Sequence, residues 1–163
     1  GTPVQQISLI VVGKPAGFYA DGVAEYQKRL QRLCRLEVIE LAEEAIDEKN
    51  ASPAQVAAAL EKEGGRILAA LPKGATLAAL CVEGKALSTK AFAGWLEQQA
   101  TYGGGAVAFA IGSSHGLAPA VKARAAKRIS LSGMTLPHQL ARLVLTEQIY
   151  RAFMIRAGTR YNR

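Results

Sequence analysis

Three glycine-bearing or polar segments carry the residue types best suited to binding a small molecule. They are Glu83-Gly84-Lys85, the loop 112–116 and the segment 131–138. Each follows an apolar run of strand length, and ligands of open parallel sheets bind beyond the carboxyl ends of the strands. Glycine at such a point lets a ligand approach the main chain without a Cβ in the way. We therefore expect one ligand site formed by these three segments.

The spacing of the glycines argues against two common nucleotide sites. The stretch Gly112-Ser-Ser-His-Gly116 does not match the dinucleotide fingerprint, and the sequence nowhere has the Gly-Lys-Ser/Thr ending of a phosphate-binding P-loop. An enzyme that uses NTP or NAD is therefore disfavoured. A plain tight turn explains the same loop as well as a ligand does, so the motif by itself does not identify the ligand.

A few titratable side chains could take part in catalysis. His138 could accept a proton or contact a ligand, and His115 is the weaker candidate, although an ordinary polar loop residue is the alternative for both. Glu147 and Arg151 are four residues apart on a predicted helix, a spacing that a surface ion pair explains fully. Tyr161 in the tail could stack on a nucleic-acid base or anchor the tail on the core.

The cysteines and histidines do not indicate a metal site. Cys34 and Cys81 lie in predicted structured segments, and the two histidines add no ligand cluster for zinc or iron–sulfur. We expect both thiols in the core and no bound metal.

Positive charge is concentrated at the C-terminal end of the chain. Residues 122–163 hold nine Lys/Arg and one Asp/Glu, whereas residues 1–121 hold 11 and 12 of them, so the whole net charge of +7 comes from the last quarter. Such asymmetry is typical of proteins that bind nucleic acid. A solvated face without a specific partner is the alternative. Membrane binding is disfavoured, because the basic segment lacks a matching exposed aromatic face.

Five apolar, β-rich runs alternate with five helical patterns. The runs cover about 7–12, 36–41, 76–82, 106–111 and 128–132. This alternation is typical of an α/β fold with a mostly parallel sheet and helices packed on it. No repeat or linker interrupts the order, which predicts a single domain over 1–163. The apolar runs are too short to cross a bilayer and the start does not resemble a signal peptide, so we expect a soluble cytoplasmic protein.

Capping signals set several helix ends. Ser52, followed by proline and then Gln55, predicts a capping box, and Ser88 predicts the start of the next helix, which should end at a left-handed Gly103. A final helix is expected over about 139–156, stopped by Gly158. Its predicted core face consists of Leu140, Leu143, Val144 and Tyr150.

The C-terminal motifs resemble those of a known family. Leu131-Ser-Gly-Met-Thr-Leu-Pro-His138, joined to the helix Arg142-Leu-Val-Leu-Thr-Glu-Gln-Ile-Tyr-Arg-Ala152, is similar to the ribosomal RNA large-subunit methyltransferase H family of the SPOUT class. The resemblance extends over essentially the whole chain, from Leu9-Ile-Val-Val-Gly-Lys14 through Leu80-Cys-Val-Glu-Gly-Lys85 to the tail tyrosine.

The resemblance implies much that residue patterns alone do not. It implies a five- to six-stranded sheet with helices on both faces, a C-terminal trefoil knot and a homodimer with sites near the subunit interface. It implies S-adenosyl-L-methionine as methyl donor and ring nitrogen N3 of a pseudouridine in 23S ribosomal RNA, within the assembled ribosome, as acceptor. By matching position, it implies cofactor contacts from Leu80, Gly112, Leu131, Ser132, Gly133, Met134, Thr135 and Leu136, and catalytic roles for His138, Glu147, Arg151 and Tyr161.

Two positions depart from the family pattern. Asn162 stands where the tail usually has a histidine, and an amide cannot accept a proton in its place. Ser113 stands where a second glycine is common, and serine keeps the backbone donors. On this resemblance, we interpret Arg151 as the cation that stabilises the negative charge formed when the pseudouridine N3–H loses its proton. His138 or water would accept that proton.

Two other classes of protein would explain part of the pattern. A non-catalytic basic RNA-binding module of the same fold accounts for the C-terminal charge but needs no glycine-lined rim. A flavodoxin-like carrier accounts for the strand–helix alternation but not for the basic C-terminal segment.

Overall fold

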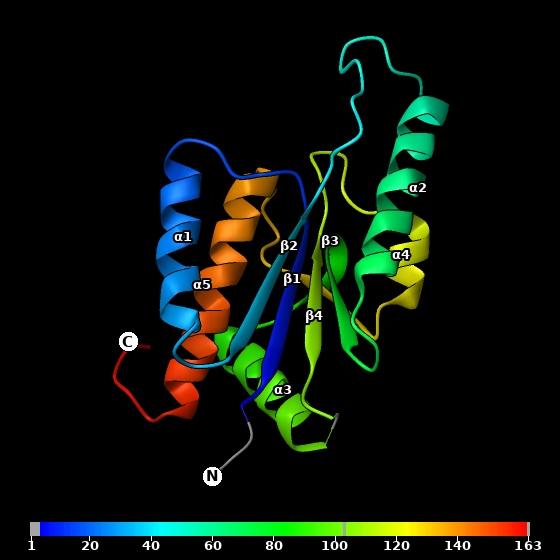
Figure 1. Ribbon diagram of the computed structural model, residues 1–163. Coiled ribbons are helices and arrows are strands. Elements are labelled where there is room, and N and C mark those ends of the chain that lie inside the picture. The colour runs from blue at the N-terminus through cyan, green and yellow to red at the C-terminus, as the bar shows by residue number, and fades with distance from the viewer. Residues whose placement is uncertain (1–3, 103, 163) are drawn as a thin grey trace.

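The computed structural model describes residues 4–102 and 104–162. Strands and helices alternate along the chain, as the sequence predicts (Figure 1). The strands are β1 (Gln6–Val12), β2 (Arg35–Leu41), β3 (Thr76–Ala86), β4 (Val107–Ile111) and β5 (Lys127–Ser130). The helices are α1 (Phe18–Leu30), α2 (Pro53–Ala70), α3 (Thr89–Tyr102), α4 (Pro119–Arg124) and α5 (His138–Arg156).

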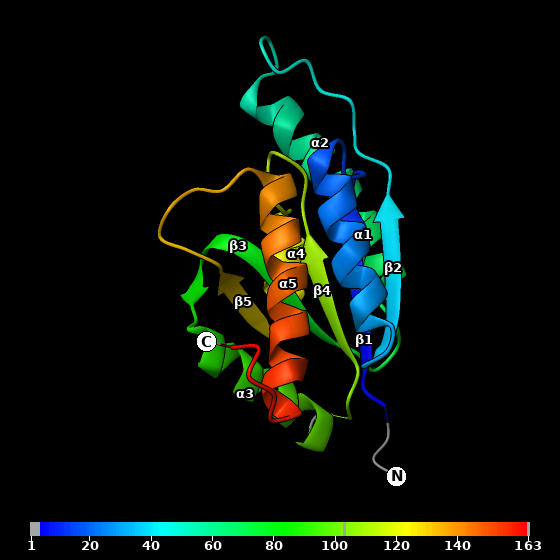
Figure 2. The same ribbon diagram turned by 90° about the vertical axis from the view of Figure 1, so that its left-hand side faces the viewer.

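The five strands form one sheet in the order β2-β1-β4-β3-β5, and every neighbouring pair is parallel. Helices α1, α3 and α5 cover one face, and α2 and α4 cover the other (Figures 1 and 2). Because all strands run the same way, their carboxyl ends share one edge of the sheet. The predicted α/β fold with helices on both faces is confirmed.

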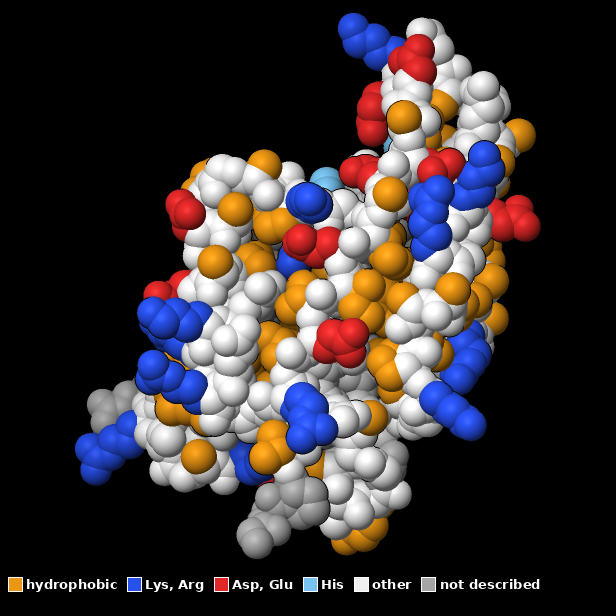
Figure 3. Space-filling view, in the orientation of Figure 1, with side chains coloured by type: hydrophobic (Ala, Val, Ile, Leu, Met, Phe, Trp, Pro, Cys, Tyr) orange, Lys and Arg blue, Asp and Glu red, His pale blue; other side chains and the backbone are white. Residues whose placement is uncertain are grey.

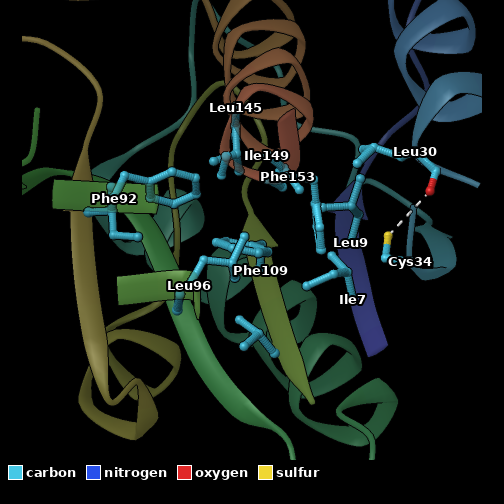
Figure 4. Close-up of a cluster of buried hydrophobic side chains, with 14 of the residues drawn as sticks. Ile7, Leu9, Leu30, Cys34, Phe92, Leu96, Phe109, Leu145, Ile149 and Phe153 are labelled. Atoms are coloured by element: carbon cyan, nitrogen blue, oxygen red, sulfur yellow. Dashed lines mark hydrogen bonds between the residues drawn. The ribbon is translucent and has the colours of Figure 1, made fainter. Parts of the chain in front are cut away.

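Each face of the sheet has its own hydrophobic core. On the α1, α3 and α5 side, Phe109 of β4 and Leu96 of α3 are fully buried beside Ile149 of α5 (Figure 4). On the other side, Ile67 of α2 and Val121 of α4 pack against inward-facing residues of β1, β3 and β4. Strands buried on both faces explain the nearly continuous apolar runs in the sequence.

The capping predictions are confirmed where the structure describes them. The Ser52 hydroxyl accepts a hydrogen bond from the Gln55 backbone N–H, and the Gln55 side chain accepts one from the Ser52 N–H. The Ser88 hydroxyl accepts from the Ala91 N–H at 3.0 Å. Gly158 follows α5 with a φ of 75°. The predicted cap at Gly103 lies outside the described residues.

The predicted loop Glu83-Gly84-Lys85 is wrong, because these residues belong to β3. The strand pairs with β5 in two registers, with an irregularity between Leu80 and Lys85 that keeps β3 extended past its expected end. A Cβ on Gly84 would lie 2.8 Å from the backbone of β5, so glycine here permits close strand packing. Sequence patterning cannot reveal such a bulge.

The predicted core face of α5 is also wrong in part. The buried positions include Leu145, Ile149 and Phe153. The four residues predicted to face the core, Leu140, Leu143, Val144 and Tyr150, are only half-buried, and of these Tyr150 packs against the core. Apolar residues occur on two sides of this helix, and the spacing alone favours the wrong side. None of the described helices is long and apolar enough to span a membrane.

Candidate functional site

The carboxyl edge of the sheet contains a cavity of about 320 Å³. It lies between the ends of β3 and β4, the loop 112–116 and the segment 131–138. Its volume is within the range of small-molecule sites. The three predicted segments thus line one cavity, to which Glu83 contributes from a strand instead of a loop.

Most of the predicted cofactor contacts line this cavity. They are Leu80, Gly112, Leu131, Ser132, Met134, Thr135 and Leu136, and His138 lines it too. Gly133 is the exception, since it does not belong to the cavity wall. The lining combines apolar side chains with serine hydroxyls and two histidines, which suits a ligand with both a flat apolar part and polar ends.

Gly112 lies in the wall of the cavity and packs closely against Gly116. A Cβ at this position would lie 2.1 Å from the carbonyl oxygen of Gly116, a distance at which the backbone would have to move. The loop is closed by a hydrogen bond from the Gly116 N–H to the Ser113 carbonyl at 2.9 Å, and Gly116 has a φ of 87°. The two glycines are therefore required by this loop conformation.

A side-chain hydrogen bond shapes the wall after β5. The Ser132 hydroxyl accepts from the backbone N–H of Met134 at 2.9 Å, and the Ser130 hydroxyl donates to the Ser132 carbonyl at 3.0 Å. The Met134 side chain is 81% exposed at the rim. A large apolar side chain this exposed is suited to covering a ligand or a partner surface. The segment loops outward between β5 and α5 (Figure 2).

Both histidines line the cavity, including His115, which was the weaker candidate on sequence. His138 is the first residue of α5. His115 Nε2 lies 3.3 Å from a carboxylate oxygen of Glu48, without the alignment of a hydrogen bond. Among the described residues, His138 forms no ion pair with a carboxylate, in contrast to His115.

The other three predicted catalytic residues gather near the C-terminal end of α5. Arg151 Nε donates to both carboxylate oxygens of Glu147, at 2.7 and 3.2 Å, and this hydrogen bonding raises the pKa of Arg151. Arg151 Nη1 donates to Asn162 Oδ1 at 3.1 Å. The Arg151 guanidinium also lies 4.7 Å from the Tyr161 ring centroid.

Tyr161 anchors the tail on the helix. Its ring meets the Tyr150 ring edge-on with centroids 4.9 Å apart. Burial, reinforced by the neighbouring Tyr26 hydroxyl, raises the pKa of Tyr161 to about 12. Of the two interpretations given by the sequence, anchoring of the tail is therefore the one seen in this chain.

A single chain does not bring the two groups together. Arg151 follows His138 by 13 positions along α5, which corresponds to about 20 Å at 1.5 Å per residue. The cavity thus lies at the N-terminal end of α5, whereas Arg151 and Tyr161 lie toward its C-terminal end. A reaction that uses both the cavity and Arg151 must therefore take one of the two from another molecule.

Part of the C-terminal positive charge is used inside the protein. Arg142 is 3% exposed, and its guanidinium donates to Glu40 at 2.9 Å and to Gln27 at 3.2 Å. It therefore joins α5 to β2 and α1. Lys122 pairs with Glu83, and this hydrogen bond lowers the pKa of Glu83. Lysines and arginines counted in a sequence thus overstate the charge that is free to meet a polyanion.

The structure also corrects the expectation for one cysteine. Cys34 is buried, as predicted, and its thiol donates to the Leu30 carbonyl (Figure 4). Cys81 instead lies partly buried in the cavity wall. Among the described residues, no group of three or more His, Cys, Asp or Glu is placed to hold a metal ion.

Sequence reasoning missed one buried carboxylate next to the site. Glu63 of α2 is 3% exposed and accepts a hydrogen bond from the Ser113 hydroxyl at 3.0 Å. A signal was present, because Glu63 is three or four residues from Leu60 and Ile67, on the apolar face of its helix. A charged residue at a core position of a helix indicates a buried polar contact.

Comparisons with known proteins bear on this arrangement. A family model described as "Predicted SPOUT methyltransferase" matches residues 5–162. A protein of Ligilactobacillus salivarius named ribosomal RNA large subunit methyltransferase H is 47% identical over 158 residues, covering 96% of this chain and 99% of that protein. A protein of the same name from Streptococcus sanguinis is 46% identical over 159 residues, covering 97% and 99%.

Solved structures support the same fold. A probable methyltransferase from Bordetella pertussis Tohama I aligns with a TM-score of 0.58 at 16% identity, over 91% of this chain and 95% of that one. At this identity the similarity concerns the fold alone. Together with the family match and the two relatives, it leads to one conclusion. The chain belongs to the SPOUT methyltransferase family and, within it, to the ribosomal RNA large subunit methyltransferase H family.

Proposed function

We propose that the protein uses S-adenosyl-L-methionine to methylate ring nitrogen N3 of a pseudouridine in 23S ribosomal RNA, acting as a cytoplasmic homodimer on the assembled ribosome. The observation that carries the proposal is the cavity at the carboxyl edge of the sheet, whose wall contains seven of the eight residues expected to contact the cofactor. The names of the relatives, which specify large-subunit ribosomal RNA, support the choice of substrate.

The shape and chemistry of the cavity fit the proposed cofactor. At Gly112 the wall consists of bare backbone, and no side chain could be accommodated there. Leu80, Leu131 and Leu136 offer apolar surface for an adenine ring, while His138 and the backbone of the loop 112–116 supply polar groups. When bound, S-adenosyl-L-methionine supplies an activated methyl group on a sulfonium ion.

The residues of the chain must then orient the acceptor and handle one proton. The imide N3–H has to lose its proton, and a fixed cation stabilises the negative charge that develops. Arg151 fits this role, since Glu147 and Asn162 hold its guanidinium in place. His138, or a water molecule, accepts the proton. Holding the reacting nitrogen in line with the methyl group accounts for much of the rate.

A homodimer can unite the two groups that one chain keeps apart. Every residue of α5 is buried or half-buried in the single chain. The half-buried residues include the apolar side chains of Leu140, Val144 and Met154. An apolar helix face left partly open is suited to burial against a second copy. In our proposal the second copy brings its Arg151 and Tyr161 to the cavity of the first.

Free positive charge is available for the RNA backbone. Arg124, Arg128 and Arg160 are exposed, in contrast to the buried Arg142. Phosphate contacts by such side chains fix the orientation of an RNA without reading its sequence. In this proposal the cavity and the tail select the nucleotide that is methylated.

The test is methyl transfer from labelled S-adenosyl-L-methionine to ribosomes that lack the modification, with naked 23S RNA in parallel. We expect label in assembled ribosomes and, after nuclease digestion, in a single N3-methylated pseudouridine. RNA binding without any methyl transfer would favour a non-catalytic basic RNA-binding module of the same fold. Label at another nucleotide would contradict the proposed acceptor.

A further inference from the structure

A buried carboxylate on α2 lies directly behind the wall of the cavity. Glu63 is 3% exposed and lies between the buried residues Ala59 and Ile67. Within the described part of the chain, Glu63 forms no ion pair with a lysine or arginine. A buried charge without hydrogen-bond partners is strongly unfavourable, so its contacts indicate its role.

Glu63 accepts two hydrogen bonds, one from each of two loops at the carboxyl edge of the sheet. Its Oε1 accepts from the Ser113 hydroxyl at 3.0 Å, in the loop that follows β4. Its Oε2 accepts from the Glu44 backbone N–H at 2.9 Å, in the loop that follows β2. One carboxylate thus connects the glycine loop of the cavity with its neighbour.

Close packing brings the carboxylate to this place. Gly64, the next residue, lies so near α4 that a Cβ on it would be 2.7 Å from the Ala118 side chain. Ser113 is 4% exposed and lines the cavity beside Gly112, while its hydroxyl is committed to Glu63. The backbone of the loop is therefore what the cavity presents to a ligand.

The neighbouring loop is secured independently of Glu63. Arg66 donates to the Glu44 carboxylate at 2.7 Å and to the Ala42 carbonyl at 2.9 Å. This hydrogen bonding lowers the pKa of Glu44. Acidic side chains gather on the projecting loop between β2 and α2 (Figure 3). Because that loop has its own anchor, it gives Glu63 a fixed base from which to hold Ser113.

We propose that Glu63 is a positioning residue: through Ser113 it holds the loop 112–116 in the conformation that binds the cofactor. The identity of that cofactor rests on the proposed function, whereas the positioning itself does not. Glu63 has no contact with the ligand in this proposal. Its effect reaches the ligand through the backbone of Gly112 and Ser113.

The primary test compares Glu63→Ala with Glu61→Ala, an exposed glutamate on the same helix. Titration calorimetry with S-adenosylhomocysteine measures affinity, and circular dichroism confirms folding. Loss of a hydrogen bond to a charged group predicts weakening by about tenfold or more for Glu63→Ala. Glu61→Ala should bind as the wild type does. Equal affinity of both variants would overturn the proposal.

Further variants of Glu63 and Ser113 distinguish a positioning role for Glu63 from a general contribution to stability. In Glu63→Gln, the amide can donate to the Ser113 oxygen while its carbonyl accepts from the Glu44 N–H, so binding should be restored to within about threefold of wild type. Ser113→Ala should weaken binding as Glu63→Ala does, and the double variant should be no weaker than either single variant. Additive losses would contradict action through Ser113, and Ser113→Ala provides the test if Glu63→Ala does not fold.

Hydrogen exchange of a backbone amide tests the positioning role of Glu63 without any ligand. The Gly116 N–H donates to the Ser113 carbonyl, so its exchange rate reports on the loop. We expect faster exchange of this amide in Glu63→Ala and Ser113→Ala, and an unchanged rate in Glu61→Ala. If the wild type fails to bind S-adenosylhomocysteine but this pattern is found, the proposed cofactor is wrong and the positioning role stands. Unchanged exchange in all three variants would refute the role.

Discussion

The contacts of some residues near the candidate site can be predicted from residue type and spacing, and those of others cannot. The pairing of Glu147 with Arg151 follows from their spacing, and the structure confirms it. The same sequence counts Arg142 among the cations available for RNA, yet Arg142 is buried against Glu40. Residue type and spacing predict local contacts within one helix. They cannot predict a contact between residues 102 positions apart.

Replacement of Arg151 should affect the chemical step more than cofactor binding. In our account this guanidinium stabilises charge that exists only as N3 is deprotonated, so Arg151→Ala should lower kcat by on the order of a hundredfold or more. The affinity for S-adenosylhomocysteine should change by less than about twofold. Single-turnover methyl transfer and calorimetry measure the two quantities. Lys73→Ala, an exposed cation outside the basic C-terminal segment, is the control. Equal losses of rate and affinity in Arg151→Ala would refute the assigned role.

The buried thiol of Cys34 should make stability depend on pH in the alkaline range. Burial raises the pKa of Cys34 from about 9 to about 12. Between these values the unfolded chain releases a proton that the folded protein keeps. The free energy of unfolding should therefore be insensitive to this group below pH 9 and should fall as pH rises from 9 toward 12. Urea titrations of the wild type and of Cys34→Ala across this range isolate the effect. Parallel pH dependences in the two proteins would show that Cys34 does not contribute.

At the scale of elements, the order of strands and helices was predictable because the strands are rich in apolar residues, the central ones being buried on both faces, and because some helices begin with a capping signal. Ser52 and Gln55 form the predicted capping box. The extension of β3 past Val82 was not predictable, because it depends on pairing with β5 through an irregular register. The buried side of α5 was missed for a related reason: both sides of the helix are apolar, and only packing distinguishes them.

The loop 112–116 provides the prediction at this scale. Gly112→Ala would place a methyl group against the Gly116 carbonyl, so the loop must move and the cavity must lose its shape. We expect S-adenosylhomocysteine affinity to fall below detection, while circular dichroism shows a folded protein. Gly65→Ala is the control, since a Cβ on this exposed glycine of α2 meets nothing within 4 Å. Undiminished binding by Gly112→Ala would exclude this loop from the cofactor site.

At the scale of the whole molecule, the single chain presents an incomplete arrangement. The cavity with His138 lies at one end of α5, and Arg151 with Tyr161 lies near the other. The sequence predicts both groups, and their separation follows from the predicted helix over 139–156, because 13 positions along a helix span about 20 Å. The homodimer implied by the family resemblance resolves the separation if the two copies place their final helices side by side. The trefoil knot implied by the same resemblance stays a prediction.

A crystal structure of the protein with S-adenosylhomocysteine tests the central claim most directly. Our account predicts the nucleoside in the cavity between Leu80, Gly112 and the segment 131–136, with Arg151 of a second copy beside the position of the missing methyl group. A nucleoside bound elsewhere on the molecule, with this cavity empty, would contradict it.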